Sequence, residues 1–346
     1  MSIKTFSAIV ILLTGFAIHS CTDNFQANLE TDPTPVVYGI INPDDSIYSI
    51  RLSKTFVGPG NALYYSKLTD SIYYRDAHVY LEVQTLDGQL LERIEMTETE
   101  IERRDPGIFS REPNYVFQTD SSQVHLKPAW YASQGIPYDL NLKIIAEIPG
   151  TEEPVTSVTR LRSKPRITSP RSAFYKVYFY GENSFFMQWT DDNPQGYFEI
   201  LVRLHYTDVF AYEEHDMTAE WVLKGIQVNQ TSYPGGTLAF YSYYFRPENF
   251  YSQVRAAIED DTTVLARVAR NVDFIILSSN QEMELYRRIY EMADDYHGAG
   301  YSNITNGLGL FTTYITNGVY NLTLGEQELD SLSNGRYTGH LRFKKW

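Results

Sequence analysis

The chain has 346 residues, 43% of them hydrophobic, and its 29 Lys and Arg residues face 43 Asp and Glu residues, which gives a net charge of −14. An acidic surface of this size repels phosphate backbones, and the sequence has no basic run with interleaved aromatic residues. These features exclude nucleic acid as a partner. A chain of this length fills more than one hydrophobic core, so we expect two folded domains.

The N-terminal segment has the features of an export signal. Residues 6–18 read FSAIVILLTGFAI, follow the basic Lys4 and are too few to span a bilayer, which takes roughly 20 apolar residues. The next residues resemble the bacterial lipobox, because Ile18 stands three positions before Cys21 and the small Ser20 directly before it. The alternative is an ordinary signal peptide followed by a chance cysteine.

The lipobox resemblance implies that residues 1–20 are removed and that Cys21 is lipidated as the new N-terminus. Cys21 is the only cysteine, so a framework of disulfides within the chain is excluded. Residues 21–35 are polar, lack periodicity and end with two prolines, which is typical of a tether. We therefore expect the protein to be held to a membrane by lipid on Cys21.

Residues 36–165 carry the period-2 alternation of β-strands. Residues 36–41 and the segment ending at Lys54 form a predicted hairpin around the turn NPDD, with Tyr48, Ile50 and Leu52 on one face. Further alternating segments are separated by turn residues, and the side chains expected to point inward are Ala77, Val79, Leu81, Val83, Tyr138, Leu140, Leu142 and Ile144. We expect a first antiparallel β-sandwich over these residues.

Residues 166–346 begin a second set of strands. Two predicted strands flank a turn, with the inward residues Phe185, Met187, Trp189, Phe198, Ile200, Val202 and Leu204. A tryptophan that ends one strand and a tyrosine that opens the next are similar to the fibronectin type III pattern, over about 25 residues. We expect a second sandwich, and the fold class is all-β in the main, with two antiparallel sandwiches of immunoglobulin or fibronectin type III kind.

One segment, near residues 280–297, has helical spacing. Its apolar positions are Met283, Tyr286, Ile289, Tyr290 and Ala293. Ser279 and Glu282 fit a capping box, and Gly298 stands where a helix would end. The sequence predicts one amphipathic helix that covers a sheet edge or a core.

Several segments in order resemble one known family. The signal and lipobox, the early PVVYGIINPDDSIYSIRLSKTF, the tryptophan hairpin and the late YSNITNGLGLF of residues 301–311 are similar to outer-membrane lipoproteins of Bacteroidota known as domain of unknown function 4249. The resemblance covers nearly the whole mature chain. It implies an outer-membrane location and an accessory role beside a TonB-dependent transporter, and it implies no reaction.

Catalytic and metal-binding signatures are scarce. The sequence has no HExxH, GxSxG, phosphate-loop or CxxC motif. His205, Glu213, Glu214, His215 and Asp216 form a cluster in which Glu213 and His215 share a strand face, so a metal or acid–base site competes with a solvated strand end. Asp191, Asp192 and Asn193 offer oxygen atoms to calcium, but a turn favours the same residue types. We expect no enzyme activity, no metal and no cofactor.

Tyrosine, present 28 times, is the more informative signal. It clusters in residues 63–76 and 240–251, and the first cluster lies in a long connection between strands. Tyrosine gives a large contact area at a low entropic cost, although it is also a good strand residue. We expect Tyr64, Tyr65, Tyr73 and Tyr74 to form a surface for a partner or ligand. Residues 240–251 are the second candidate for such a surface, but they alternate like a strand, and we expect them to continue as one.

Together these features predict a lipid-anchored binding protein of the outer membrane that works with a TonB-dependent transporter in ligand capture or uptake. The alternative is a structural or assembly lipoprotein that makes only protein contacts. A hydrolase is the third alternative, but the ionisable groups do not converge in the sequence.

Overall fold

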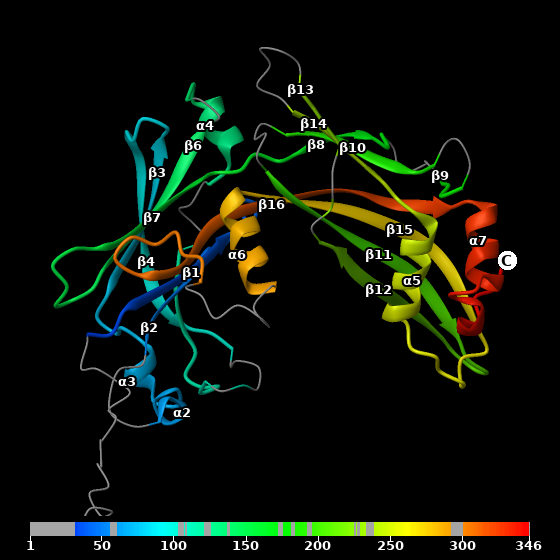
Figure 1. Ribbon diagram of the computed structural model, residues 1–346, viewed down its shortest axis with the longest axis horizontal. Coiled ribbons are helices and arrows are strands. Elements are labelled where there is room, and N and C mark those ends of the chain that lie inside the picture. Colours follow the sequence, from blue (N-terminus) through cyan, green and yellow to red (C-terminus); the bar gives the residue numbers. More distant parts are fainter. Residues whose placement is uncertain are drawn as a thin grey trace, which may run out of the picture.

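The structure is a computed structural model, and it describes residues 32–55, 61–102, 107, 109–120, 126–136, 139–171, 176–180, 184–191, 196–224, 226, 229–232, 239–291 and 300–345. The fold is all-β and sandwich-like, as the sequence predicts, with one large and one small sheet (Figure 1). The large sheet is mixed rather than purely antiparallel, because two of its strand pairs are parallel.

The large sheet has 12 strands, in the order β12-β11-β15-β16-β1-β2-β5-β4-β3-β6-β7, with β9 paired to β16. Its strands are β1 (Pro35–Ile41), β2 (Ser49–Lys54), β3 (His78–Thr85), β4 (Leu90–Glu100), β5 (Tyr115–Gln118), β6 (Leu140–Glu147), β7 (Val155–Arg160), β9 (Lys176–Val177), β11 (Tyr197–Val209), β12 (Glu214–Leu223), β15 (Ala266–Ser279) and β16 (Leu308–Leu324). The small sheet has the order β13-β14-β10-β8. Its strands are β8 (Arg166–Ser169), β10 (Phe186–Asp191), β13 (Asn229–Ser232) and β14 (Ala239–Tyr244).

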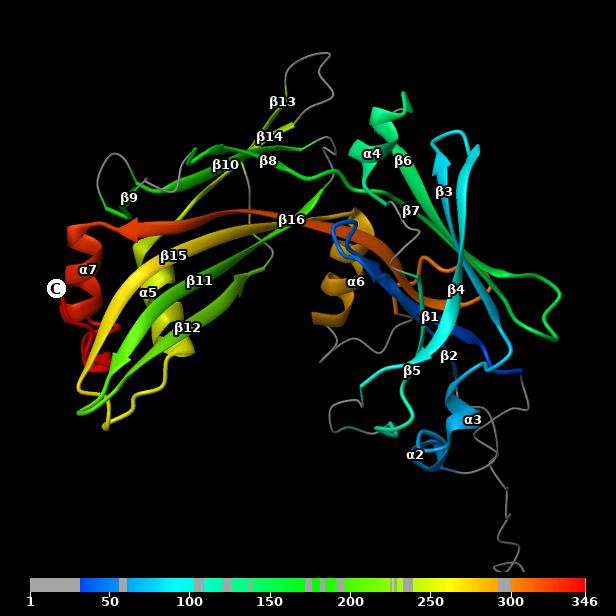
Figure 2. The same cartoon turned by 180° about the vertical axis from the view of Figure 1, so that it is seen from behind.

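The helices are short and lie around the sheets (Figures 1 and 2). They are α2 (Ala62–Tyr65), α3 (Thr69–Ile72), α4 (Pro128–Ser133), α5 (Pro247–Ala257), α6 (Gln281–Glu291), α7 (Glu326–Asn334) and the 3-10 turn η1 (Gly339–Leu341). The segment expected to continue as a strand after β14 instead becomes α5. Pro247 explains the change, because it occupies the first helical position, where a missing N–H costs nothing, and it ends the strand ladder.

Strand β16 joins the two halves of the molecule: the first half contains β1 to β7, and the second half contains β8 to β15 with α5 and α7. Its first part pairs in parallel with β1, from Leu308 opposite Val36 to Thr313 opposite Ile41. Its second part pairs antiparallel with β15, from Tyr314 opposite Ser279 onward. One 17-residue strand therefore carries the large sheet from one half of the molecule into the other.

The first half curls around its own core. Its last strand, β7, returns to the segment before β16, where Thr156 and Thr305 exchange backbone hydrogen bonds of 3.1 and 2.8 Å. The inward residues predicted from alternation are buried, except Tyr138, which lies outside the described residues. Ile304 and Phe311, near the other end of the chain, belong to this core. The observed organisation thus differs from the expected division at residue 165, since the late segment packs into the first half.

The second half has a separate core between the large sheet, the small sheet and the helices α5 and α7. Trp189 is fully buried, packs against Phe198 with ring centroids 5.3 Å apart, and lies nearly parallel to Tyr241. All the inward residues predicted for β10 and β11 are buried here. The tryptophan hairpin expected from the sequence is wrong as a pairing, because β10 pairs with β14 and β8 in the small sheet and β11 pairs with β12 and β15 in the large one, so the two strands contribute to this core from different sheets.

The segment that leads into β16 explains the pattern of the YSNITNGLGLF sequence. The Asn303 side chain mimics a strand partner: its Nδ2 donates to Phe311 O at 2.7 Å, and its Oδ1 accepts from Phe311 N at 2.9 Å. Asn306 and Gly309 have positive φ angles of 59° and 118°. A Cβ on Gly309 would lie 1.9 Å from Val37 O, so only glycine allows β1 and β16 to approach.

Buried polar groups fill the junction between the halves. Arg162, in the connection after β7, donates to both carboxylate oxygens of Asp191 at 2.6 Å, and both residues are nearly inaccessible. Ser278, at the end of β15, donates to Asp191 at 2.8 Å. Asn280 donates to Arg160 O at 2.8 Å and to Thr313 Oγ1 at 3.2 Å. These bonds tie the connection, β10, β15 and β16 together.

The amphipathic helix predicted from spacing is α6, and it covers the sheet at this junction (Figures 1 and 2). Met283 is buried with Tyr197 and Leu310, and the Tyr286 ring meets Tyr38 of β1 edge to face. The expected capping box is wrong in one respect: Ser279 is the last residue of β15, and its hydroxyl donates to Thr313 O at 2.8 Å.

Replacing Gly309 by alanine tests the close approach of β1 and β16. Gly88, in the β3–β4 turn, also has a positive φ of 87°, but a Cβ there meets nothing within 4 Å. We expect Gly88→Ala to lower the free energy of unfolding by about 1–2 kcal/mol, the strain of a left-handed residue, and Gly309→Ala to lower it by clearly more. Urea unfolding of both variants measures the difference, and equal losses would contradict the steric argument.

Candidate functional site

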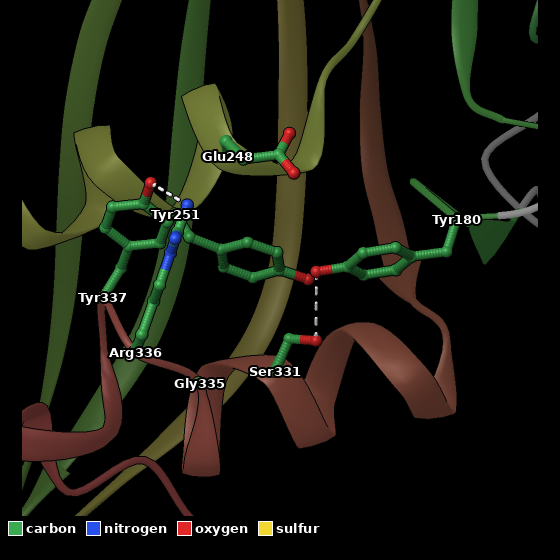
Figure 3. Close-up of a pocket in the computed structure, with 7 residues that line it drawn as sticks. All are labelled: Tyr180, Glu248, Tyr251, Ser331, Gly335, Arg336 and Tyr337. Atoms are coloured by element: carbon green, nitrogen blue, oxygen red, sulfur yellow. Dashed lines mark hydrogen bonds between the residues drawn. The ribbon is translucent and has the colours of Figure 1, made fainter.

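A recess of about 450 Å³ opens at the end of the second half, where α5, α7 and the segment after β9 meet (Figure 3). It is lined by aromatic, charged and small residues: Tyr180, Glu248, Tyr251, Ser331, Gly335, Arg336 and Tyr337. Its lining comes from segments about 150 residues apart in the chain. The volume is within the range of roughly 300–1,000 Å³ that is usual for small-ligand sites.

Tyr251 is the most buried residue of the recess. Helix α5 presents Phe250, Tyr251 and Val254 to the core, so the Tyr251 ring is only 3% exposed. Its hydroxyl donates to Glu328 O at 3.3 Å. Burial raises the pKa of Tyr251 far above that of an ordinary tyrosine, so the phenol keeps its proton and remains a hydrogen-bond donor at neutral pH.

Tyr180 lies beside Tyr251, with ring centroids 6.5 Å apart, and their hydroxyl groups point toward each other (Figure 3). The backbone beside Tyr180 is held by α7, because Phe179 N donates to the buried Glu328 carboxylate at 2.7 Å. Ser331 Oγ lies 3.4 Å from the Tyr180 hydroxyl oxygen. Three hydroxyl groups therefore meet at the centre of the recess.

Arg336 and Tyr337 form the opposite wall. A Cβ on Gly335 would lie 2.2 Å from Ser331 O, so glycine is needed for the tight turn that follows α7. Arg336 then donates to the Tyr337 hydroxyl at 2.6 Å, and its guanidinium lies 4.6 Å from the centre of the Tyr337 ring. The hydrogen bond and the cation–π contact orient the guanidinium.

Glu248 completes the rim from the first turn of α5, where its carboxylate is exposed and favoured by the helix dipole. Within the described part of the chain, neither Glu248 nor Arg336 forms an ion pair. The recess therefore offers an open carboxylate acceptor on one side and open guanidinium donors on the other.

The four tyrosines predicted from the first cluster do not share one surface. Tyr64 is 63% exposed and its ring meets that of Tyr65 edge to face. Tyr73 is only 3% exposed and packs against Tyr115, so most of its ring is in the core, although it lines a small hollow together with Tyr74. Tyr74 is half-buried, donates to Pro33 O at 2.9 Å and lines a smaller hollow of about 280 Å³.

An apolar surface nevertheless remains on this connection. Leu63, Tyr64 and Leu68 are 54%, 63% and 38% exposed, and we call them the α2 surface. It lies in the first half, whereas the recess lies at the opposite end of the molecule, beside the C-terminus (Figures 1 and 2).

The predicted histidine and carboxylate cluster is divided by the structure. His215 Nε2 lies 3.3 Å from Glu213 Oε2 at the exposed start of β12, and Asp216 accepts from Thr207, while Glu214 is exposed. His205 instead bonds to residues of other strands. These groups therefore do not converge on one point.

His205 lies between a hydroxyl group and a carboxylate. Its Nε2 is 2.9 Å from Asp273 Oδ2, and its Nδ1 is 3.3 Å from Thr218 Oγ1. The other Asp273 oxygen accepts from Asn321 N at 2.8 Å, where β16 has a positive φ. Asp273 thus stabilises the irregularity in β16, which gives the arrangement a structural role.

The residues predicted to offer oxygen atoms to calcium either have another partner or lie outside the described residues. Asp191 is the partner of Arg162, and Asp192 and Asn193 lie outside the described part of the chain. In that part, no group of three or more His, Cys, Asp or Glu side chains is placed to hold a metal ion. Cys21, the signal peptide and the tether before Asp32 lie outside it as well. No described helix is long and apolar enough to cross a membrane.

Sequence reasoning did not identify the recess. Tyr251 falls in the second tyrosine cluster, and that cluster is the one signal that points to the site. Glu248, Ser331 and Arg336 carry no motif, because only the fold brings α5 and α7 together. No protein-family model matches the chain, and no curated protein has significant sequence similarity to it.

Two single variants, Tyr73→Ser and Tyr64→Ser, test whether the first tyrosine is buried and the second exposed. Tyr73→Ser removes a buried ring, so we expect the free energy of unfolding to fall by about 3 kcal/mol or more. Tyr64→Ser changes an exposed position and should alter it by less than about 0.5 kcal/mol. Chemical denaturation measures both values. A stable Tyr73→Ser protein would contradict the core assignment.

Proposed function

We propose that the chain is a lipid-anchored binding protein of the outer membrane that captures a small ligand and works with a TonB-dependent transporter in its uptake. The observation that carries the proposal is the tyrosine-lined recess, with Glu248 and Arg336 free of ion pairs among the described residues. Aromatic walls with a few polar groups that point to one centre are typical of ligand sites. The lipobox at Cys21 and the resemblance to the lipoprotein family support the location and the transporter.

The arrangement of the molecule fits this role. The described chain begins at Asp32, 11 positions after Cys21, and Thr34 there donates to Thr55 beside β2. The recess is at the other end of the molecule (Figure 1). A tether on the first half would hold the recess away from the membrane, where it is accessible to a soluble ligand.

A structural or assembly lipoprotein is the second candidate, and the α2 surface favours it. Exposed Leu63, Tyr64 and Leu68 form an apolar area near the start of the described chain. Such an area suits a protein contact. The same surface also suits contact with a transporter, so experiments must separate binding at the recess from contact at α2.

Replacing Cys21 by alanine tests the anchor. We expect the variant to leave the membrane fraction after an alkaline wash, because lipid on Cys21 is the proposed attachment and one or more acyl chains supply roughly 0.8 kcal/mol per buried methylene. Radioactive palmitate should label the wild type and not the variant. A wild-type protein without label, or a variant that stays bound, would contradict the proposal.

Two surface variants test the transporter role. A tagged wild-type protein purified from outer membranes should carry a TonB-dependent transporter with it. Leu63→Ser with Tyr64→Ser should reduce this co-purification, since apolar and aromatic residues at an interface commonly contribute more than about 1 kcal/mol each. Tyr212→Ser, at a fully exposed tyrosine in the β11–β12 turn, is the matched control.

The recess variant Tyr180→Ala should leave co-purification unchanged and reduce uptake. If the α2 variant damages the outer membrane while the recess variant has no effect on growth under any nutrient supply, the assembly role replaces the binding role. If no transporter co-purifies with the wild type, the transporter role is wrong.

A further inference from the structure

We propose that the recess binds one or two rings of a neutral saccharide. This inference rests on the proposed binding function and adds the chemical class of the ligand. It is argued from the hydroxyl groups at the centre of the recess, the two charged side chains on its rim, and its aromatic walls (Figure 3).

The centre of the recess is made of hydroxyl groups. Tyr180, Tyr251 and Ser331 direct their oxygens to one place (Figure 3), and the hydrogen bonds from Ser331 to Tyr180 and from Tyr251 to Glu328 O are long, at 3.4 and 3.3 Å. A hydroxyl group both donates and accepts, so each retains capacity for another hydroxyl group. The three hydroxyl groups carry no charge themselves, so they supply hydrogen bonds to a ligand and no ion pair. The centre therefore matches a neutral ligand with several hydroxyl groups.

The rim provides one acceptor and one donor. The Glu248 carboxylate only accepts hydrogen bonds, and Arg336 only donates them. Since neither has an ion-pair partner in the described part of the chain, both are open to a ligand. A sugar ring carries hydroxyl groups that satisfy both at once, and charge-assisted bonds to hydroxyl groups are stronger than bonds between neutral groups.

The walls suit the apolar faces of a sugar ring. Tyr180 is 36% exposed, and the ring planes of Tyr180 and Tyr251 lie within 19° of each other. Tyrosine rings supply a rigid amphipathic contact area, and a pyranose has a C–H face that packs on such a surface. The volume of about 450 Å³ is at the small end of ligand sites, which limits the bound part to one or two rings.

Calorimetric titration of the full-length lipidated protein tests the proposal. The protein is kept in a detergent without a sugar headgroup, because a maltoside would compete for the recess. The probes are maltotriose, cellotriose, xylotriose and N,N′-diacetylchitobiose, with the dipeptide Ala-Ala as a zwitterionic comparison. We expect at least one saccharide to bind with a Kd below about 1 mM and Ala-Ala not to bind.

Three variants link binding to the recess. Tyr180→Ala should weaken saccharide binding by about tenfold or more, because it removes an aromatic wall. Glu248→Gln and Arg336→Gln should weaken it by about fivefold or more, because each removes the charge that strengthens a hydrogen bond to the bound ring. Tyr212→Ser should have no effect. Binding should also change little between about 50 and 500 mM salt, since a neutral ligand is not screened.

The outcomes separate this inference from the binding function itself. Saccharide binding that is lost in the recess variants supports both. Binding of Ala-Ala with the same dependence on Tyr180 and Glu248 overturns the saccharide class and leaves the binding function standing. No binding of any saccharide at about 10 mM, or saccharide binding unchanged in Tyr180→Ala with a wild-type circular dichroism spectrum, overturns the inference.

Discussion

The pairing of β16 with both halves is the constraint on which the rest of the structure depends. The strand pairs with β1 in the first half and with β15 in the second half, so the large sheet runs through both. Helix α7 follows β16 directly. The position of the recess is thus set by a strand whose start lies in the other half. The close approach at Gly309 and the side-chain bridge of Asn303 are the local features that make this pairing possible.

The polar groups beside β16 determine how the halves meet. A buried ion pair such as Arg162 with Asp191 adds little net stability, since removing both charges from water costs about as much as their attraction returns. Loss of one partner is costly, because the remaining charge is then buried alone. Such a pair favours one arrangement over others in which its members would be apart. We infer that the junction contributes specificity to the fold more than stability.

Tyrosine has three different roles in this protein, and its chemistry allows each of them. Tyr73 fills a core, Tyr64 is exposed on a short helix, and Tyr251 lines a recess with its hydroxyl group toward the open space. A ring that is apolar at its faces and polar at its tip suits all three environments. The density of tyrosine along the chain is therefore a poor guide to any one site, and burial separates the roles.

Local patterns in the sequence determined several of the strands with their inward faces, and the helix α6. Alternation in residues 36–54 and 185–204 identified core positions correctly, because the two faces of a strand meet different environments wherever the strand pairs. The tertiary structure alone decided the parallel β1–β16 pair, the packing of Phe311 into the first core and the recess. These depend on contacts between segments far apart in the chain, and no local periodicity encodes which distant segment a strand or helix will meet. For the same reason Tyr73 and Tyr64, neighbours in one predicted surface, are separated by the fold into core and exterior.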